Sequence, residues 1–555
     1  MSAIEREKED QSWQHAYAAL SIAFLCLVVG LPLWWKTTTT YRASLPDSEI
    51  TGIASLQTFC KIPVTVVLVG GDVSQNNLNS LQNHLDYTLV SDYSGRYSRL
   101  TFHYAVNVRS ANKRETDVFR LKSTLKDLDA DIYLLDQEST VGSSIVYILQ
   151  DYSGVFHVSK IHVGRYRHAF VSGQDLKSAA ALAAQVVKEL HVNEALAAKI
   201  HGTAAGVKHT EADVESMRSV RSTPGYELTF SLLNPSPDVI IAKWDIAEGI
   251  RSYLDPFLKT LTEYADFTVN SQVLYYMGLA VTPTKDDTNK RYVLNAASLP
   301  HLINPVEAKL GSHVSTNPTL NFLVYVPPPS QSPLHILNEH GDTVTNNAFL
   351  SPRWGGIMLY NSPRDTSGNV TLPDTVDVDM KTVMEVFLSQ LRLLIGVPKQ
   401  KSDPLLTIAS PDNTGITHWE LDFLLRTRTL ENVATATLTL SSLSQLLGQI
   451  RNMVIRDDIA EQVYIAVESI QSTHSYLKDG NMYRAFHSSK RAIQASETAF
   501  FDPSLLELLY FPEDQKFAIY IPLFLPMSIP VLMSTVKALK WIKSKRRQNK
   551  RAKRD

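Results

Sequence analysis

The chain has 555 residues, 44% of them hydrophobic, which is enough for about two to four ordinary domains with a large core. Its 54 basic and 56 acidic residues nearly cancel, which argues against a dedicated nucleic-acid-binding protein. A charged content of 20% with 9% aromatic residues excludes a mainly disordered chain. The two cysteines exclude a disulfide scaffold and a multi-cysteine metal centre.

An uncharged apolar run near the N-terminus, residues 16–35, predicts a transmembrane helix preceded by a cytosolic segment, 1–15. A helix of this length rises about 30 Å, the thickness of the hydrocarbon core of a bilayer. Tryptophan and tyrosine residues lie at both of its ends, as in an interfacial belt. A cleaved signal peptide is the rival interpretation, but the preceding segment is acidic and the apolar run is too long.

A few residues at the start of this span are expected at the depth of the cytosolic lipid headgroups. These residues are Gln14, His15 and Tyr17. Two interpretations stay open for them: ordinary anchoring at the interface, and contact with membrane lipid beside a lipid-handling site.

A second uncharged apolar run, residues 517–536, predicts a second transmembrane helix. Ten Lys and Arg residues and one acid follow it in the tail 537–555, so the positive-inside rule places this tail in the cytosol. Two crossings put both termini on the same side of the membrane. We therefore expect residues 36–516 in the lumen of a secretory compartment.

Three prolines, Pro522, Pro526 and Pro530, punctuate the second span at a spacing of four residues. This spacing places them on one face of the helix, where each proline removes a backbone hydrogen bond and frees a carbonyl. Freed carbonyls in lipid need partners, so the proline face is expected to pack against protein or polar groups. A simple kinked anchor and a helix shaped for a multi-subunit bundle both fit the pattern.

The predicted lumenal part contains one thiol, Cys60, because Cys26 lies within the first span. An unpaired thiol in an oxidising compartment is either buried or bonded to another chain, and burial is favoured because free cysteine is among the most buried residue types. One glycosylation sequon begins at Asn369.

The fold class expected for the lumenal part is mixed α/β over residues 36–373, followed by a mainly helical region over 374–516. The order strand–helix–strand over 64–108 recurs over 226–276, which is compatible with a duplicated α/β unit. The C-terminal helices are expected at 418–455, 458–477 and 482–499. The pattern predicts strands at 64–69, 99–108, 132–135, 144–149, 155–163, 226–233, 267–276, 321–326 and 356–360, and helices at 76–85, 176–198 and 242–264.

A search for catalytic chemistry finds neither a nucleophile elbow nor a P-loop. The spacing of His335, Glu339 and His340 matches no zinc motif. The acid runs 127–131 and 377–379 could hold a divalent cation, as in a membrane-anchored, metal-dependent lumenal glycosyltransferase, which is our alternative function. Acids at the start of a helix explain the second run equally well. We therefore predict no catalytic, cofactor or metal site.

Several unusual strings, spread over the whole chain, resemble the PIG-S family of glycosylphosphatidylinositol (GPI) transamidase subunits. They are GLPLWWKTTTTYRASLP at 30–46, PPP at 327–329 with SPL at 332–334, WGGI at 354–357, FDPSLL at 501–506 and YFPEDQK at 510–516.

The resemblance implies residence in the endoplasmic reticulum membrane, in a complex with PIG-K, PIG-T, PIG-U and the GPI anchor attachment protein. This machine replaces a C-terminal signal of a translocated protein with GPI. In the family picture, a thiolate on PIG-K forms the acyl intermediate. A PIG-S member is a non-catalytic subunit that supports assembly and formation of this acyl (carbonyl) intermediate, and it brings no cofactor.

Overall fold

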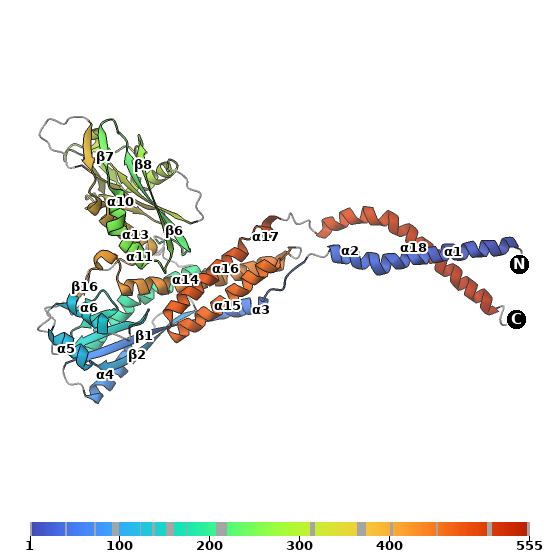
Figure 1. Cartoon of the computed structure of the whole chain (residues 1–555), viewed down its shortest axis with the longest axis horizontal. Helices are drawn as coiled ribbons and strands as arrows, with labels where there is room; N and C mark the ends of the chain where they lie inside the picture. Colours follow the sequence, from blue (N-terminus) through green and yellow to red (C-terminus); the bar gives the residue numbers. More distant parts are fainter. Residues whose placement is uncertain are drawn as a thin grey trace. The chain divides into compact units, whose positions relative to one another are not determined.

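The computed structural model describes residues 3–38, 41–70, 74–90, 99–121, 124–135, 139–150, 160–173, 175–206, 219–310, 317–362, 373–399, 403–450, 453–507 and 513–551 (Figure 1). The chain forms two compact units. We call the first the end-helix unit; it comprises Met1–Ile50, Thr439–Ile465 and Ala495–Asp555. The second, the sheet unit, comprises Thr51–Leu438 and Ala466–Gln494.

The first sheet of the sheet unit has six strands in the order β16-β4-β5-β3-β1-β2. Every neighbouring pair is parallel except β4 and β5. The β-branched run predicted at 64–69 forms the buried end of β1, an internal strand, and strands covered on both faces have continuous apolar runs. The strands are β1 (Thr58–Val69), β2 (Leu100–Ser110), β3 (Ser144–Leu149), β4 (Ile161–Val163), β5 (His168–Val171) and β16 (Leu406–Ile408).

The second large sheet has five strands in the order β13-β14-β11-β6-β8, and it repeats the strand order of the first. In each sheet the first strand lies between the second and the third, and an antiparallel hairpin follows beyond the third. This shared order supports the duplicated unit that the sequence suggested. The strands are β6 (Gly225–Asn234), β8 (Asp266–Tyr275), β11 (Thr319–Tyr325), β13 (Ala348–Ser351) and β14 (Gly355–Leu359).

Two small sheets, β12-β10-β9 and β15-β7, complete the β structure of the described residues. Their strands are β7 (Ile240–Lys243), β9 (Thr284–Asp286), β10 (Arg291–Asn295), β12 (Leu334–Leu337) and β15 (Asp374–Asp377). The region expected to be mainly helical is confirmed by three long helices, although it also supplies β15 and β16. These helices are α14 (His418–Gln449), α15 (Asp457–Asp479) and α16 (Met482–Phe500).

The remaining helical segments include short π and 3₁₀ turns, labelled η. They are α1 (Ala3–Leu25), η1 (Cys26–Gly30), α2 (Leu31–Thr38), α3 (Asp47–Ser55), α4 (Gln75–Thr88), α5 (Lys113–Leu121), α6 (Leu125–Leu135), α7 (Leu176–Gln185), η2 (Val186–His191), α8 (Glu194–Ala204), α10 (Ile246–Gly249), η3 (Ile250–Leu254), α11 (Asp255–Thr260), η4 (Ala296–Ser298), α12 (Pro300–Glu307), η5 (Pro329–Gln331), α13 (Met380–Ile395), η6 (Asp412–Thr414), α17 (Ser504–Glu507) and α18 (Glu513–Arg551).

Three of the predicted elements are wrong in part. The strand expected at 132–135 is the last turn of α6, because Leu128 and Ile132 bury one helical face. The helix expected at 176–198 is divided at Asn193, which has φ 44° and whose side chain accepts a hydrogen bond from the Leu196 amide. The helix expected at 242–264 begins as β7 and continues as the short segments α10, η3 and α11.

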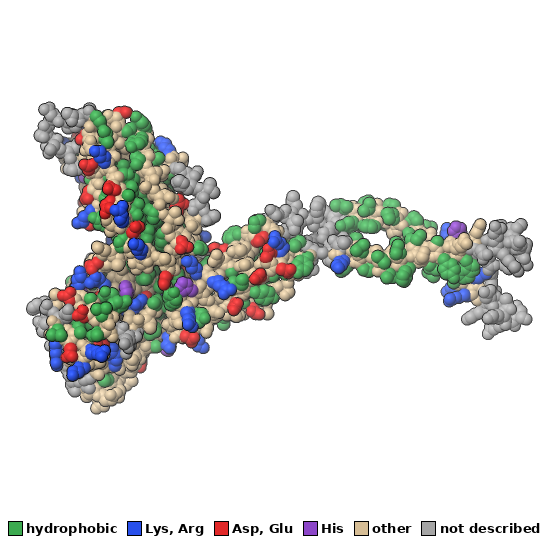
Figure 2. Space-filling view, viewed as in Figure 1, with side chains coloured by type: hydrophobic (Ala, Val, Ile, Leu, Met, Phe, Trp, Pro, Cys, Tyr) green, Lys and Arg blue, Asp and Glu red, His purple; other side chains and the backbone are tan. Residues whose placement is uncertain are grey.

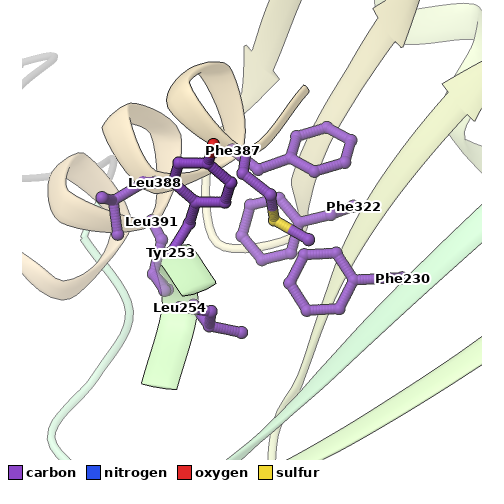
Figure 3. A pocket seen from close by; sticks show the side chains of 8 residues that line it. Phe230, Tyr253, Leu254, Phe322, Phe387, Leu388 and Leu391 are labelled. Carbon is purple, nitrogen blue, oxygen red and sulfur yellow. The ribbon is translucent and has the colours of Figure 1, made fainter. Parts of the chain in front are cut away.

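Helix α13 packs on the five-stranded sheet through an aromatic cluster (Figure 3). Phe387 of α13 lies 5.3 Å from Phe322 of β11 and 5.9 Å from Phe230 of β6, measured between ring centroids. Tyr253, Leu254 and neighbouring leucines of α13 close the cluster. The space left among these side chains is too small to hold a water molecule, so this cluster is packed core and not a ligand cavity.

The first turns of α14 are fixed to the six-stranded sheet by buried polar bonds. Trp419 donates its indole N–H to the Gly164 carbonyl at 3.1 Å. The guanidinium of Arg167 donates to the Asp422 carboxylate at 2.8 Å, and both groups are buried. Arg426 donates to the carbonyls of His191 and Gly142, each at 3.1 Å. These bonds satisfy charges that would otherwise be costly to bury.

Changing Asp422→Ala should lower the free energy of unfolding by about 3–5 kcal/mol, because it leaves the Arg167 guanidinium buried without its carboxylate. Thermal unfolding of the detergent-purified chain measures the effect. The matched control is Asp458→Ala, which removes an exposed partner of Arg456 and should change stability little. Equal shifts for both variants would contradict this account of α14.

Candidate functional site: two paired apolar helices

Two helices of the end-helix unit are long and apolar enough to cross a membrane, over Gln11–Lys36 and Ala518–Arg547. Their side chains are almost entirely exposed in the chain, as Figure 2 shows by the hydrophobic residues along both helices. A core helix of a soluble protein would be buried instead. An exposed apolar surface of this length is stable only against lipid or another protein.

Aromatic pairs join the two helices near both ends. Trp13 packs edge to face on Trp541 with centroids 4.8 Å apart, and Trp34 lies 6.2 Å from Tyr520. The pairing joins the start of one helix to the end of the other, so the helices are antiparallel. The aromatic residues have the same separation on both helices, which corresponds to a rise of about 30 Å, the thickness of a hydrocarbon core. The pairs are therefore placed like the two interfacial girdles of a membrane protein.

The residues predicted to contact lipid lie at the Trp13 end of this pair. Trp13 and the buried Ala16 face the inside of the helix pair, whereas Gln14, His15 and Tyr17 are exposed. Trp13 also stacks on Tyr17 with centroids 5.6 Å apart. This leaves three adjacent polar or amphipathic side chains on the outer surface at the level of one aromatic girdle.

The three prolines of α18 are all exposed and lie inside a continuous helix. The residues of α18 that lose exposure beside α1 recur every three or four positions. They include Val531, Thr535, Ala538 and Ile542. At 100° per residue, this buried stripe lies on the side of the helix opposite the prolines. The proline face thus points away from α1.

The segment that follows the first apolar helix is fixed to other parts of the end-helix unit. The guanidinium of Arg42 donates to the Leu447 carbonyl at 2.7 Å and to the Ile450 carbonyl at 3.3 Å, near the C-terminal end of α14. Tyr41 donates its hydroxyl to Asp457 of α15 at 2.7 Å. A guanidinium suits this place because the last carbonyls of a helix have no backbone donors. These bonds give a structural role to the string YR at 41–42.

The string WGGI at 354–357 forms the start of β14, beside β11. Gly355 has φ 144°, and a Cβ atom there would collide with the backbone of Asn321. A Cβ atom at Gly356 would collide with the side-chain amide of Gln390, which donates to the Phe349 carbonyl at 3.1 Å. The two glycines therefore allow β11 and α13 to approach β14 closely.

Nucleophilic and basic side chains of the sheet unit are engaged in structural contacts. Cys60 is buried, which confirms the favoured interpretation, and burial raises the pKa of its thiol to about 11 although Arg426 opposes this. Ser144 lies 2.6 Å from the ring Nδ1 of His191, and both are buried. Burial lowers the pKa of His191 to about 3.

The acid and histidine runs considered for a metal do not converge. Asp129 is buried, lies 2.9 Å from the His168 ring nitrogen and accepts the amide N–H of Arg165. Asp379 caps α13 by accepting the Lys381 amide N–H. Across the part of the chain that the structure describes, no group of three or more His, Cys, Asp or Glu residues is placed to hold a metal ion. Asn369 lies outside the described residues.

Comparisons with known proteins agree with these features. The family model "Phosphatidylinositol-glycan biosynthesis class S protein" matches residues 21–545. The chain belongs to the PIG-S family. It is similar to the human "GPI-anchor transamidase component PIGS", with 44% identity over 533 residues that cover 94% of each chain. The "GPI transamidase component PIG-S homolog" of Schizosaccharomyces pombe is 26% identical over 552 residues, covering 97% of this chain and 86% of the relative.

A more distant relative is the "GPI transamidase component GPI17" of Saccharomyces cerevisiae. It is 24% identical over 541 residues, which cover 94% of this chain and 91% of the relative. The family match covers most of both apolar helices and the whole region between them, as the strings at 30–46 and 501–516 led us to expect.

Stability should fall as the pH drops from 6.5 to 4. Burial lowers the pKa of His191 to about 3 and that of His201 to about 4, so both stay neutral in the folded chain, whereas the unfolded chain binds protons below about pH 6.5. His191 alone should remove about 2 kcal/mol of stability by pH 5. Thermal unfolding midpoints at pH 7.5 and pH 5 test this expectation. The unfolding midpoint of His191→Asn should change less between these two pH values than that of the unaltered chain. An equal change in both would contradict the expectation.

Proposed function

We propose that this chain is a non-catalytic subunit of a GPI transamidase, which attaches GPI anchors to proteins in the endoplasmic reticulum. The observation that carries the proposal is the family match over nearly the whole chain, with relatives that are themselves named as transamidase components. Its partners would be PIG-K, PIG-T, PIG-U and the GPI anchor attachment protein. In this complex the chain supports assembly and the formation of the acyl (carbonyl) intermediate on the catalytic subunit.

The contacts of the reactive residue types support a non-catalytic role. The Cys60 thiol is buried with a raised pKa, and a thiol is a nucleophile only as the thiolate. His168 and Asp129 lie together like a base and its orienting acid, but Asp129 also accepts backbone amides of the β4–β5 turn, and both residues are buried. These groups serve the packing of the sheet unit.

The antiparallel helix pair supports a topology with two membrane spans. Both termini lie at the Trp13 and Trp541 end of the pair, so one side of the bilayer would hold both. The basic residues after the second span favour the cytosol for that side. Residues 36–516, with the α/β region to 373 and the helical region from 374, would then be lumenal.

The outer faces of the paired helices support a role in assembly and contact with the membrane. The proline face of α18 points away from α1, and its freed carbonyls would take donors from transmembrane helices of the other subunits. Gln14, His15 and Tyr17 would contact lipid headgroups on the cytosolic side.

Protease treatment of sealed microsomes tests the topology. We expect residues 36–516 to be protected and a C-terminal epitope tag to be removed, because only the two terminal segments would be accessible. Asn369→Gln should abolish a shift in gel mobility that a glycosidase also removes. Digestion of the region between the spans in intact microsomes would overturn the topology.

Co-purification in mild detergent tests the proposed subunit role. The chain should recover the other transamidase subunits in fixed stoichiometry, and cells that lack it should lose GPI-anchored proteins from their surface. Re-expression of the chain should restore them, and Cys60→Ser should restore them equally well. The proposal would be contradicted if the chain were recovered alone and the isolated polypeptide turned over a substrate.

A further inference from the structure

Among the residues that the structure describes, strand β8 forms one edge of the five-stranded sheet and pairs only with β6 (Figure 1). Asp266 donates its amide to the Pro224 carbonyl at 3.0 Å, and Tyr276 donates to Asn234 at 2.9 Å. Successive residues of a strand direct their backbone groups to opposite edges. The even-numbered residues of β8 therefore face β6, and the odd-numbered residues direct their N–H and C=O groups outward.

The outward groups of the second half of β8 are open. Ser271, Val273 and Tyr275 are exposed, with exposed fractions of 38% for Val273 and 59% for Tyr275. Within the described residues, no hydrogen bond reaches their outward backbone groups. Such a row of unpaired donors and acceptors is a template for another strand.

This edge also lacks the features that normally prevent pairing with other chains. Natural edge strands are kept apart by short length, lysine, proline or a bulge. Strand β8 has ten residues and pairs with β6 in an unbroken register from Asp266 to Tyr275. It contains no Lys, Arg or Pro, and its one charged residue is Asp266, at the beginning of the strand.

The equivalent edge of the first sheet provides an internal comparison. There, β2 occupies the position of β8, and Gln82 of α4 covers part of its outer edge. The Gln82 side-chain amide donates to the Val106 carbonyl and accepts from the Val108 N–H, each at 3.1 Å. A carboxamide has the donor and acceptor of a peptide group. The duplicated unit therefore covers part of one such edge with an amide of its own, whereas the other edge has no such cover within the described ranges.

From these observations we infer that the outer edge of β8 pairs with an extended strand of another transamidase subunit. The inference rests on the proposed function, because it requires a complex. A permanently bound subunit is favoured over a transiently bound precursor protein. An unprotected edge would be prone to aggregation whenever a transient partner was absent. Val273 and Tyr275 lie on one face of the sheet, so the added strand should carry apolar residues at alternate positions beside them.

Amide hydrogen exchange of the intact, detergent-purified complex tests the pairing directly. The outward amides of Ser271, Val273 and Tyr275 should exchange at least about tenfold more slowly in the complex than in the chain purified alone. Equal, fast exchange in both samples would overturn the inference. Slow exchange in the chain purified alone would also overturn the inference. The molecular mass of that sample in solution would then show whether a second copy or another segment of the same chain covers the edge.

A pair of variants tests the same edge by assembly. Val273→Pro removes only an outward N–H, so it leaves the hydrogen bonds to β6 in place, whereas the matched control Val273→Ala keeps that donor. Proline should reduce recovery of one subunit up to about tenfold, as expected for the loss of one ladder bond, and alanine should reduce it much less. Equal recovery with both variants would refute the pairing.

Unfolding midpoints of the two variants show whether proline destabilises the sheet itself. If it does, the exchange measurement on the unaltered complex tests the pairing without any substitution. If the unaltered chain recovers no other subunit at all, the proposed function fails, and this failure is distinct from a complex in which β8 stays unprotected.

Discussion

The exposure of two long apolar helices is the constraint on which the rest of this protein depends. Water cannot solvate these surfaces at low cost, so they require lipid or another protein, and the spacing of their aromatic pairs matches the thickness of a bilayer. Because the helices are antiparallel, the chain leaves the first helix and enters the second at the same end of the pair. Arg42 fixes the segment after the first helix to the carbonyls at the end of α14.

The sheet unit uses its charged and reactive groups for structure. Arg167, Asp422 and Arg426 bind the start of α14 to the first sheet, and the same seam includes His191. A buried guanidinium is costly unless its charge is compensated by hydrogen bonds or a carboxylate, so these contacts specify where the helix lies as well as contributing stability. This use of buried charge is consistent with a subunit that positions partners and leaves the chemistry to another chain.

Duplication explains both the regular and the divergent parts of the sheet unit. The two large sheets share one strand order, and the central strands of each are buried. The copies differ at their edges, where a side-chain amide of α4 covers part of β2 and no group in the described part of the chain is hydrogen-bonded to the outer edge of β8. A repeated fold can thus keep its core while one copy presents its edge for assembly.

Local patterns in the sequence predicted the two apolar helices, the buried strands at 64–69 and 144–149, and the three long C-terminal helices, because length, hydrophobicity and periodicity are short-range properties. The family-like strings identified the family from residues alone. Only the tertiary structure showed that 132–135 is helical, that Asn193 divides a helix, and that Arg42, Asp422 and Gln82 bond to groups far away in the sequence. Such contacts depend on which surfaces the folded chain brings together, and no local pattern encodes that information.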